Sequence, residues 1–305
     1  MNRIPLWIDC DTGIDDAFAL LVAHGLSALQ IVGISTVSGN VHLEISTPNT
    51  LKVLLLAGAS TPVYRGAAKP LCRDYHDASE FHGPDGLGGA VLPQSTRPAE
   101  EKAMWDALYE TAKALNGELT VVTIGPMTNL ATALKRYPDL PKYLKQVVFM
   151  GGSASGGNCT PYAEYNVYAD PEAVQMVCDS GIPLVMCPLD MTHGAYLTAG
   201  DLEELAAVNT PVTRFIHESS GVLLGKNLEA DLPGICQHDT CPLMYLAHPE
   251  LFSGEKAHVH VEISDPVTLG KTYVDLDAKE KNALVLLKLD RPGFLAAAKA
   301  ALLSY

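Results

Sequence analysis

The chain has 305 residues, 48% of them hydrophobic, which is enough to bury a substantial core. Its 21 basic and 35 acidic residues give a formal net charge of −14 at pH 7, so we expect neither nucleic acid nor an anionic membrane as a partner. No stretch reaches the roughly 18 to 20 consecutive apolar residues of a membrane span, and the N-terminus shows no signal-peptide pattern. The 7 cysteines form no C-x-x-C pair, which favours reduced thiols and a cytoplasmic protein.

Strand-like and helix-like segments alternate along the first two thirds of the chain, which is typical of βαβ units around a parallel sheet. The predicted strands cover residues 4–8, 29–36, 62–64, 119–124, 146–150, 182–187, 257–263 and 283–289. The predicted helices cover residues 15–24, 51–57, 100–115, 128–136, 202–208, 212–224 and 292–303. The sequence therefore predicts an α/β fold, with a single domain over residues 1–305 and a mainly parallel, Rossmann-like open sheet flanked by helices.

Proline positions and one long irregular segment add detail to this prediction. Pro48 is expected near the first turn of the helix that includes residues 51–57, because proline inside a helix would cost about 3 kcal/mol. Asp170 precedes Pro171 and Glu172 in the order of an N-cap, a first-turn proline and an acidic residue, which predicts a structural role for Asp170. Residues 65–98 form either a functional loop or a disordered surface insertion.

Four aspartates follow the first predicted strand in the run IPLWIDCDTGIDDAFALL, namely Asp9, Asp11, Asp15 and Asp16. Helix capping explains one of the last two, because carboxylates are favoured at a helix N-terminus. Capping does not explain all four, since neighbouring carboxylates repel and raise one another's pKa unless a cation lies among them. Calcium and magnesium bind carboxylate oxygens, so the sequence predicts a divalent-metal site after the first strand.

Polar groups after the later strands supply donors and acceptors of the kind that bind hydroxyl groups. They are Asn40, Asn158, Glu164 and Asn166, together with His238 and Asp239, which immediately precede an apolar helix. In an open parallel sheet such positions share the edge where ligands bind. We therefore expect these side chains and the four aspartates to converge on one site.

With these residues in view, the chain resembles the nucleoside hydrolases, the inosine-uridine-preferring N-ribohydrolase family, along nearly its whole length. Its four aspartates match the family's D-x-D-x-x-x-D-D signature. Further matches follow in order, namely SGN ending at Asn40, HGPDGLG from His82, GPMTNLA from Gly125, FMGG, AEYNVYADPEA, LDMTH, and HDTC from His238. The resemblance implies an enzyme that hydrolyses the N-glycosidic bond of ribonucleosides to free base and ribose.

The resemblance also implies a cofactor and roles for individual residues. A calcium ion would be held by Asp11, Asp16, Asp239 and the backbone carbonyl of Met127. The ribose 2′ and 3′ hydroxyls would be held by Asp15, Asn40 and Asn166, with Asp239 touching both metal and sugar. The 5′ hydroxyl would be held by Asn158 and Glu164. A homodimer or homotetramer is implied as well.

Reaction chemistry suggests catalytic roles for two of these residues. Cleavage of an N-glycosidic bond builds positive charge on the ribose ring while the base departs with negative charge. Asp11 is placed to accept the proton of a water acidified by the cation, and would act as general base. His238, with an unperturbed pKa of about 6.5, is the candidate for protonating the departing base. The alternative is a histidine that only packs beside the metal ligand.

The chain departs from some members of the family near the base. Several relatives carry tyrosines on the helix before the last motif, where they cover the base, whereas this chain has none between Phe215 and Tyr245. Purine-specific relatives carry a tryptophan before the position of Asp239, and this chain does not. Strict purine specificity is therefore not expected.

Two other interpretations of the sequence remain. DCDTG also fits the D-x-D-x-T element of haloacid-dehalogenase-type phosphohydrolases, with Asp9 as nucleophile and Asp11 as acid/base around magnesium. That interpretation gives Asn40, Asn166 and Asp239 no role. The second alternative is a non-catalytic nucleoside or ribose binder that keeps the fold and the metal.

Overall fold

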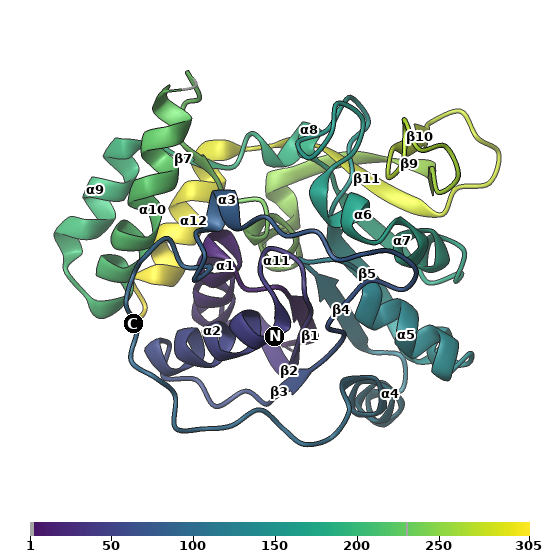
Figure 1. The fold of residues 1–305 in the computed structure, drawn as a ribbon, viewed down its shortest axis with the longest axis horizontal. Helices are drawn as coiled ribbons and strands as arrows, with labels where there is room; N and C mark the ends of the chain where they lie inside the picture. The colour runs from purple at the N-terminus through teal and green to yellow at the C-terminus, as the bar shows by residue number, and fades with distance from the viewer. Residues whose placement is uncertain (1–2, 230) are drawn as a thin grey trace.

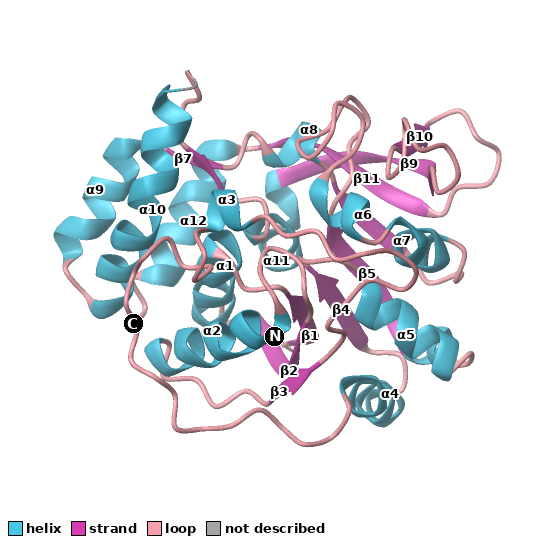
Figure 2. Cartoon of the chain, in the orientation of Figure 1, coloured by secondary structure: helices cyan, strands magenta, loops and turns pink. Residues whose placement is uncertain are grey.

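The computed structural model describes residues 3–229 and 231–305 and is built around one long sheet (Figures 1 and 2). Across these residues the strands of the sheet lie in the order β10-β9-β11-β6-β5-β4-β1-β2-β3. They are β1 (Ile4–Cys10), β2 (Leu29–Thr36), β3 (Val63–Arg65), β4 (Leu119–Thr123), β5 (Leu144–Met150), β6 (Leu184–Cys187), β9 (Phe252–Val261), β10 (Thr272–Asp275) and β11 (Ala283–Leu289). A separate antiparallel pair contains β7 (Tyr196–Leu197) and β8 (Ile235–Cys236).

The order of the strands places a ligand site at the ends of β1 and β4. Neighbouring strands from β3 across to β11 are parallel, whereas β9 and β10 at the far edge are antiparallel to their neighbours. The chain adds β2 and β3 on one side of β1, then returns to add β4, β5 and β6 on the other. Ligands of open parallel sheets bind where the direction of construction reverses, beyond the carboxyl ends of the strands. The predicted α/β fold with a mainly parallel open sheet is confirmed.

Helices cover both faces of the sheet (Figure 1). On β1, Leu6 and Ile8 belong to the core on one face and Trp7 to the core on the other, as the two-residue period of a strand requires. The first core is formed with α1 (Ile14–Gly25), α2 (Leu43–Leu56), α9 (Ala199–Val208), α10 (Pro211–Glu229), α11 (Thr240–Ala247) and α12 (Arg291–Leu302). The second is formed with α4 (Met104–Leu115), α5 (Thr128–Arg136) and α7 (Pro171–Cys178).

Short elements connect these layers. They are α3 (Ser79–His82), α6 (Tyr165–Ala169), α8 (Leu189–Thr192) and two turns of 3-10 helix, Leu140–Tyr143 and Pro249–Leu251. Asp170 is the N-cap of α7 and accepts from the backbone N–H of Ala173 at 3.2 Å, which confirms its predicted structural role. In the described ranges, no helix is both long and apolar enough to span a bilayer.

The helix that contains Pro48 is longer than the sequence predicts. α2 begins at Leu43, so Pro48 lies in its interior rather than in its first turn. Proline cannot donate to the carbonyl of Glu44, but Glu44 is exposed and water can satisfy that group. The early turns are held by tertiary hydrogen bonds, such as the one from Ser46 Oγ to the carbonyl of Val37 at 3.1 Å. These contacts outweigh the cost of proline.

Other boundaries also differ from the prediction. The helix expected from residue 100 begins at Met104, and α10 extends to Glu229 instead of ending at residue 224. The strand expected at 257–263 begins earlier, at Phe252, and β10 was not predicted at all. With four residues, two of them half-buried, β10 has too short a pattern to indicate a strand, and it forms only because β9 offers an edge.

The irregular segment 65–98 packs against the rest of the molecule. Apart from the end of β3, α3 is its only regular element in the described chain. Leu87 is buried, and Asn49 Nδ2 donates to the carbonyl of Asp85 at 2.8 Å. These contacts favour the functional loop over the surface insertion.

Candidate active site

Carboxylates from three segments meet beyond the carboxyl ends of β1 and β4. Asp11 follows β1, Asp15 and Asp16 lie in the first turn of α1, and Asp239 immediately precedes α11. One oxygen from each of Asp15, Asp16 and Asp239 lies within 4.8 Å of the other two. We call Asp11, Asp15, Asp16 and Asp239 the acidic cluster.

Asp9 lies outside this cluster and has a structural role. Its Oδ1 accepts from the hydroxyl of Ser35 on β2 and from Asn129 Nδ2, the latter at 2.7 Å. Asn129 belongs to α5 and also donates to the carbonyl of Thr36 at 3.1 Å. Asp9 therefore links β1, β2 and α5 beneath the site, and burial raises its pKa to about 7.

Asp16 is oriented by hydrogen bonds from the turn before its helix. Its Oδ2 accepts from the N–H of Gly13 at 2.8 Å and from Asn40 Nδ2 at 3.0 Å, and its Oδ1 accepts from the N–H of Asp11 at 3.2 Å. As third residue of α1, it reaches back to the N-cap in the manner of a capping box. Asp16 thus takes the capping role, and Asp15 faces the cavity described below.

Asp11 is completely buried, and only one of its two carboxylate oxygens has a hydrogen-bond partner among the described residues. Its Oδ2 accepts from the backbone N–H of Asn40 at 2.6 Å, whereas Oδ1 has no hydrogen-bond partner among the described residues. Gly39 and Gly125 pack so close that a Cβ on either would lie 2.0 or 2.7 Å from an oxygen of Asp11. Glycine at these two positions makes room for the carboxylate.

The acidic cluster fits a divalent cation. Within the described ranges, Oδ1 of Asp11, Oδ1 of Asp15 and Oδ2 of Asp239 are buried without a hydrogen-bond partner. Burial and then repulsion by neighbouring carboxylates raise the pKa values of Asp11 and Asp239 well above their usual range. Burial also raises the pKa values of Asp15 and Asp16 to about 6. Buried carboxyl groups that resist ionisation, and whose oxygens have no hydrogen-bond partner, suit a hard cation.

Met127, the source of the predicted carbonyl ligand, lies at the start of α5. Its side chain is buried, and its carbonyl accepts from the N–H of Ala131 at 3.0 Å. A carbonyl oxygen has two lone pairs, so this helical hydrogen bond leaves one for a cation. The ligand roles of Met127, Asp11, Asp16 and Asp239 stay predictions.

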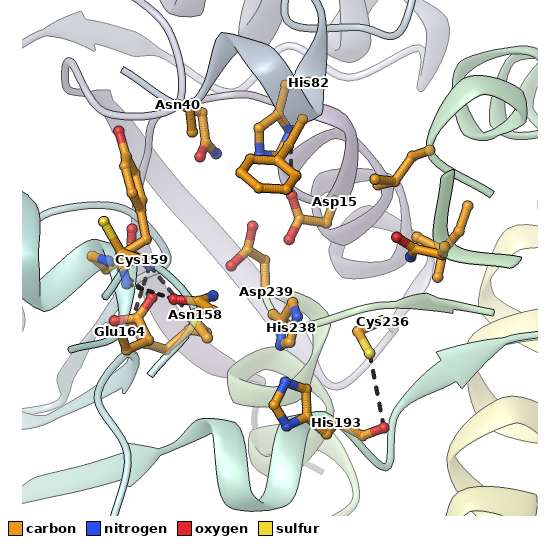
Figure 3. A pocket seen from close by; sticks show the side chains of 18 of the residues that line it. Asp15, Asn40, His82, Asn158, Cys159, Glu164, His193, Cys236, His238 and Asp239 are labelled. Atoms are coloured by element: carbon orange, nitrogen blue, oxygen red, sulfur yellow. Dashed lines mark hydrogen bonds and ion pairs between the residues drawn. The ribbon is translucent and has the colours of Figure 1, made fainter. Parts of the chain in front are cut away.

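A cavity of about 460 Å³ opens beside the acidic cluster (Figure 3). In Figure 3, Asp15 and Asp239 lie between His82 on one side and His238 on the other. The predicted substrate-binding residues all line this cavity, namely Asp15, Asn40, Asn158, Glu164, Asn166 and Asp239. Asp11, Asp16 and Met127 are buried behind the lining.

Hydrogen bonds fix the direction of three amide side chains in the cavity. Asn40 donates its Nδ2 to Asp16, and Asn166 donates its Nδ2 to two backbone carbonyls at 3.1 and 3.3 Å. Among the described residues neither Oδ1 forms a hydrogen bond, so each can accept one from a ligand. Asn158 is oriented the other way, because its Oδ1 accepts from the N–H of Tyr165 at 2.9 Å. The cavity therefore offers both acceptors and a donor, which a ligand with several hydroxyls requires.

Glu164 has a structural role that the sequence analysis missed. It is the N-cap of α6, and its carboxylate accepts from the N–H groups of Asn166, Val167 and Gly152 at 2.8, 3.1 and 2.9 Å. Burial raises its pKa to about 7. These three bonds fix Glu164 at the cavity wall, and its role toward a 5′ hydroxyl stays a prediction.

His238 lies next to the acidic cluster in a place that disfavours a charged imidazole. Its Nδ1 is 2.8 Å from Thr192 Oγ1, and its ring centroid is 5.6 Å from that of His193. Burial, with smaller contributions from His193 and His82, lowers the pKa of His238 to about 3. The unperturbed pKa assumed from the sequence therefore does not apply. A neutral imidazole still carries one N–H to donate.

His82, in the glycine-rich loop, was a candidate to line the mouth of the site, and it does line the cavity. Its Nδ1 accepts from the N–H of Ile14 at 3.1 Å and lies 3.9 Å from Asp15 Oδ1. A nitrogen that accepts a hydrogen bond carries no proton, and burial lowers the pKa of His82 to about 4. His82 is therefore neutral beside Asp15 rather than ion-paired with it. In the sequence, the HGPDGLG motif that begins at His82 indicated this position.

Apolar side chains surround the outer part of the cavity. Phe81 of α3 and Leu232 remain 50% and 49% exposed, and Leu223 of α10 also lines the opening. A polar interior with an apolar rim suits a ligand that joins a polyol to a flat apolar group. The rim draws on segments far apart in the chain, and no motif in the sequence connects them.

Three comparisons identify the family. The model of the inosine-uridine preferring nucleoside hydrolases matches residues 6–296. A pyrimidine-specific ribonucleoside hydrolase, RihA of Shewanella woodyi, is 36% identical over 297 residues, 95% of each chain. The non-specific ribonucleoside hydrolase RihC of Escherichia coli is 37% identical over 295 residues, 96% of each chain. A purine-preferring ribonucleoside hydrolase from Gardnerella vaginalis superimposes with a TM-score of 0.93 at 29% identity, covering 98% of both chains.

These matches span almost the whole chain and agree with a site at the reversal of strand order, where carboxylates border a hydroxyl-binding cavity. They favour the resemblance over the phosphohydrolase and non-catalytic interpretations. The chain belongs to the inosine-uridine preferring nucleoside hydrolase family, whose members are hydrolases of N-glycosyl bonds.

Proposed function

We propose that this protein is a calcium-dependent ribonucleoside hydrolase that releases free base and ribose. The observation that carries the proposal is the set of buried, unpartnered oxygens on Asp11, Asp15 and Asp239 beside a cavity with fixed amide acceptors and donors. The named relatives act on pyrimidine nucleosides, on nucleosides without base specificity, or preferentially on purine nucleosides. The proposal therefore covers ribonucleosides as a class, with the base range an outcome of the assay.

The residues proposed to hold the cation are Asp11, Asp16, Asp239 and the carbonyl of Met127. Carboxylate and carbonyl oxygens are the ligands that calcium prefers, and the raised pKa values of these acids would fall beside a positive charge. A calcium ion bound there would acidify a coordinated water and neutralise repulsion within the acidic cluster.

Asp11 is the proposed general base. Its Oδ2 is held by the N–H of Asn40, which leaves Oδ1 to take the proton of the attacking water. As the water attacks the anomeric carbon, the bond to the base breaks and positive charge grows on the ribose ring. The carboxylates of Asp15 and Asp239 line the cavity where that charge develops and stabilise it.

The ribose is proposed to lie against both amide acceptors. The Oδ1 atoms of Asn40 and Asn166, with Asp15 and Asp239, accept from the 2′ and 3′ hydroxyls. Asn158 and Glu164 bind the 5′ hydroxyl. Because these side chains are fixed before substrate arrives, little ordering is needed on binding, and contacts that tighten as the ring flattens lower the barrier.

His238 is proposed to assist the departing base as a neutral hydrogen-bond donor. Substituting alanine should lower kcat/KM for uridine and inosine by about 100-fold, because proton transfer or its partial equivalent contributes roughly 100- to 10,000-fold. An activated aryl riboside, whose leaving group needs no proton, should lose less than about 5-fold. Equal losses on both substrates, measured under the same conditions, would contradict the leaving-group role.

A reducing-sugar assay tests the proposed function. We expect ribose release from at least one of inosine, adenosine, guanosine, uridine and cytidine, its loss on chelation, and its return when calcium is restored. Binding without ribose release would support the non-catalytic alternative. Phosphate release from sugar phosphates in place of ribose release would support the phosphohydrolase alternative.

Three further features complete the proposal. We treat residues 1–305 as one catalytic domain and expect a homodimer or homotetramer, which sedimentation measures directly. All cysteines are free thiols, which supports a reducing compartment such as the cytoplasm. The net charge of −14 supports small nucleosides, rather than nucleic acid or membrane, as partners.

A further inference from the structure

Residues 75–82 cross the opening of the cavity, and we call them the mouth segment. They lie between β3 and α4 and include α3. The residues of this segment that line the cavity are His76, Asp77, Ala78, Glu80, Phe81 and His82. The segment therefore forms one wall of the site without supplying any residue of the acidic cluster.

One flank of the mouth segment is tied to the loop that carries Asn40. Tyr75 Oη donates to the carbonyl of Gly39 at 2.9 Å, and the N–H of Ala78 donates to the carbonyl of Asn40 at 3.1 Å. The Tyr75 ring also packs on His42 with 4.3 Å between ring centroids. This flank is therefore attached to the cavity wall that contains Asn40, a proposed acceptor for the ribose hydroxyls.

The other flank is tied to α6, the opposite sugar-binding wall. Tyr165 Oη donates to the carbonyl of His76 at 2.8 Å. The His76 ring packs edge-on against Tyr168, one turn later, at 6.1 Å between centroids. In the part of the chain that the structure describes, the Tyr165 hydroxyl supplies the hydrogen bond from α6 to the mouth segment.

Tyr165 has a second connection to the sugar-binding wall. It lies between Glu164 and Asn166, and its backbone N–H donates to Asn158 Oδ1 at 2.9 Å. Its main chain therefore orients the proposed 5′-hydroxyl ligand, while its side chain reaches the mouth segment. One residue joins the two walls of the cavity.

We propose that Tyr165 is a positioning residue whose hydroxyl holds the mouth segment against the sugar-binding wall, so that Phe81 and His82 stay beside the bound substrate. The inference rests on the proposed function for the location of the ribose. It does not require the Tyr165 side chain to touch the reacting atoms, and it leaves the acidic cluster unchanged.

Tyr165→Phe removes only this hydroxyl. We expect KM for the best nucleoside to rise about 5- to 10-fold, because the net effect of one hydrogen bond is of that size. We expect kcat to stay within about 2-fold, since neither the base nor the proposed ligands move. In the protein without substrate, amide hydrogen exchange in a peptide covering the mouth segment should become about 5- to 10-fold faster.

Tyr168→Phe is the matched control. It makes the same change on the same helix, and no hydrogen bond involves the Tyr168 hydroxyl among residues 3–229 and 231–305. We expect KM, kcat and exchange in the mouth segment to match wild type. A rise in exchange for both variants would show that any change on α6 loosens the segment, and would overturn the specific role of Tyr165.

Two other results would overturn the proposal. Unchanged exchange in Tyr165→Phe would show that the hydroxyl does not hold the segment, and faster exchange with unchanged KM would show that the segment does not position substrate. The amide hydrogen-exchange measurement does not require the protein to hydrolyse a substrate. If wild type hydrolyses no nucleoside, the proposed function fails, while exchange together with calorimetric binding of ribose still decides the role of Tyr165.

Discussion

Asp11→Asn should lower kcat/KM for every hydrolysed nucleoside by at least about 1,000-fold, because it removes a general base worth roughly 100- to 10,000-fold and weakens a proposed cation ligand. The asparagine Oδ1 can still accept from the backbone N–H of Asn40, now at 2.6 Å from the Asp11 carboxylate. The surrounding turn is therefore expected to keep its geometry. Asp11→Ala should lose at least as much, and initial rates of ribose release measure both.

Glu80→Gln is the matched control for Asp11→Asn. Glu80 is an exposed carboxylate that lines the same cavity, and within the described ranges its side chain forms no hydrogen bond or ion pair. Its activity should stay within about 3-fold of wild type, as expected for an exposed substitution. If Asp11→Asn kept more than about a tenth of wild-type turnover, the role of Asp11 as base would be excluded.

The parts of this site that the sequence predicted are those encoded by local patterns. Asp11, Asp15 and Asp16 follow one strand within a few residues, so a strand and a helix start suffice to bring them together. Asp239 is far away in sequence, and only the parallel sheet, with its reversal at β1 and β4, brings α11 to the same edge. The general rule for such sheets made that convergence predictable without any contact being known.

The parts that the sequence did not predict depend on tertiary contacts. The cost of proline inside a helix predicted Pro48 near a first turn. In the structure it lies within α2, where side-chain hydrogen bonds such as that of Ser46 hold the helix. The pKa of His238 follows from burial beside His193, which only the fold creates. The capping bonds of Glu164 depend on how the loop after β5 returns to α6. Local patterns carry none of this information.

Calcium should raise the Tm of the metal-free protein by about 8 °C. Free calcium at about 1,000 times its Kd stabilises the folded state by about 4 kcal/mol, and each kcal/mol shifts the Tm of a chain this long by about 2 °C. The cluster gives a structural reason for this response, since buried carboxylates that repel one another gain a counter-charge. Scanning calorimetry with chelator and with calcium measures the shift.

The calcium-induced shift should grow as pH rises from about 4 to about 6. The pKa values of Asp15 and Asp16 are raised from 3.8 to about 6, so the metal-free folded state holds extra protons in that window. Their contribution to metal-free stability is present below the unfolded pKa and is lost as pH rises through the folded value. Calcium binding needs Asp16 ionised as a ligand, and the positive charge of the ion also favours the ionised form of the neighbouring Asp15. Buried histidines with lowered pKa values, such as His82, change stability in the opposite direction. The prediction is therefore tested on the difference between the two Tm values, in which contributions common to both states cancel.

Asp239→Asn tests the calcium response most directly. Relative to wild type, the substitution should raise the Tm of the metal-free protein and lower the Tm of the protein with calcium. Removing a repelled, unpartnered carboxylate should raise the Tm of the metal-free protein at pH 7 and abolish most of the calcium shift. Asp201→Asn is the control, since Asp201 pairs with Arg291 and Lys299 at 3.0 and 2.9 Å away from the cavity. It should lower both Tm values and keep their difference. A calcium shift of wild-type size in Asp239→Asn would place the cation elsewhere, because a ligand that is lost cannot leave the binding free energy unchanged.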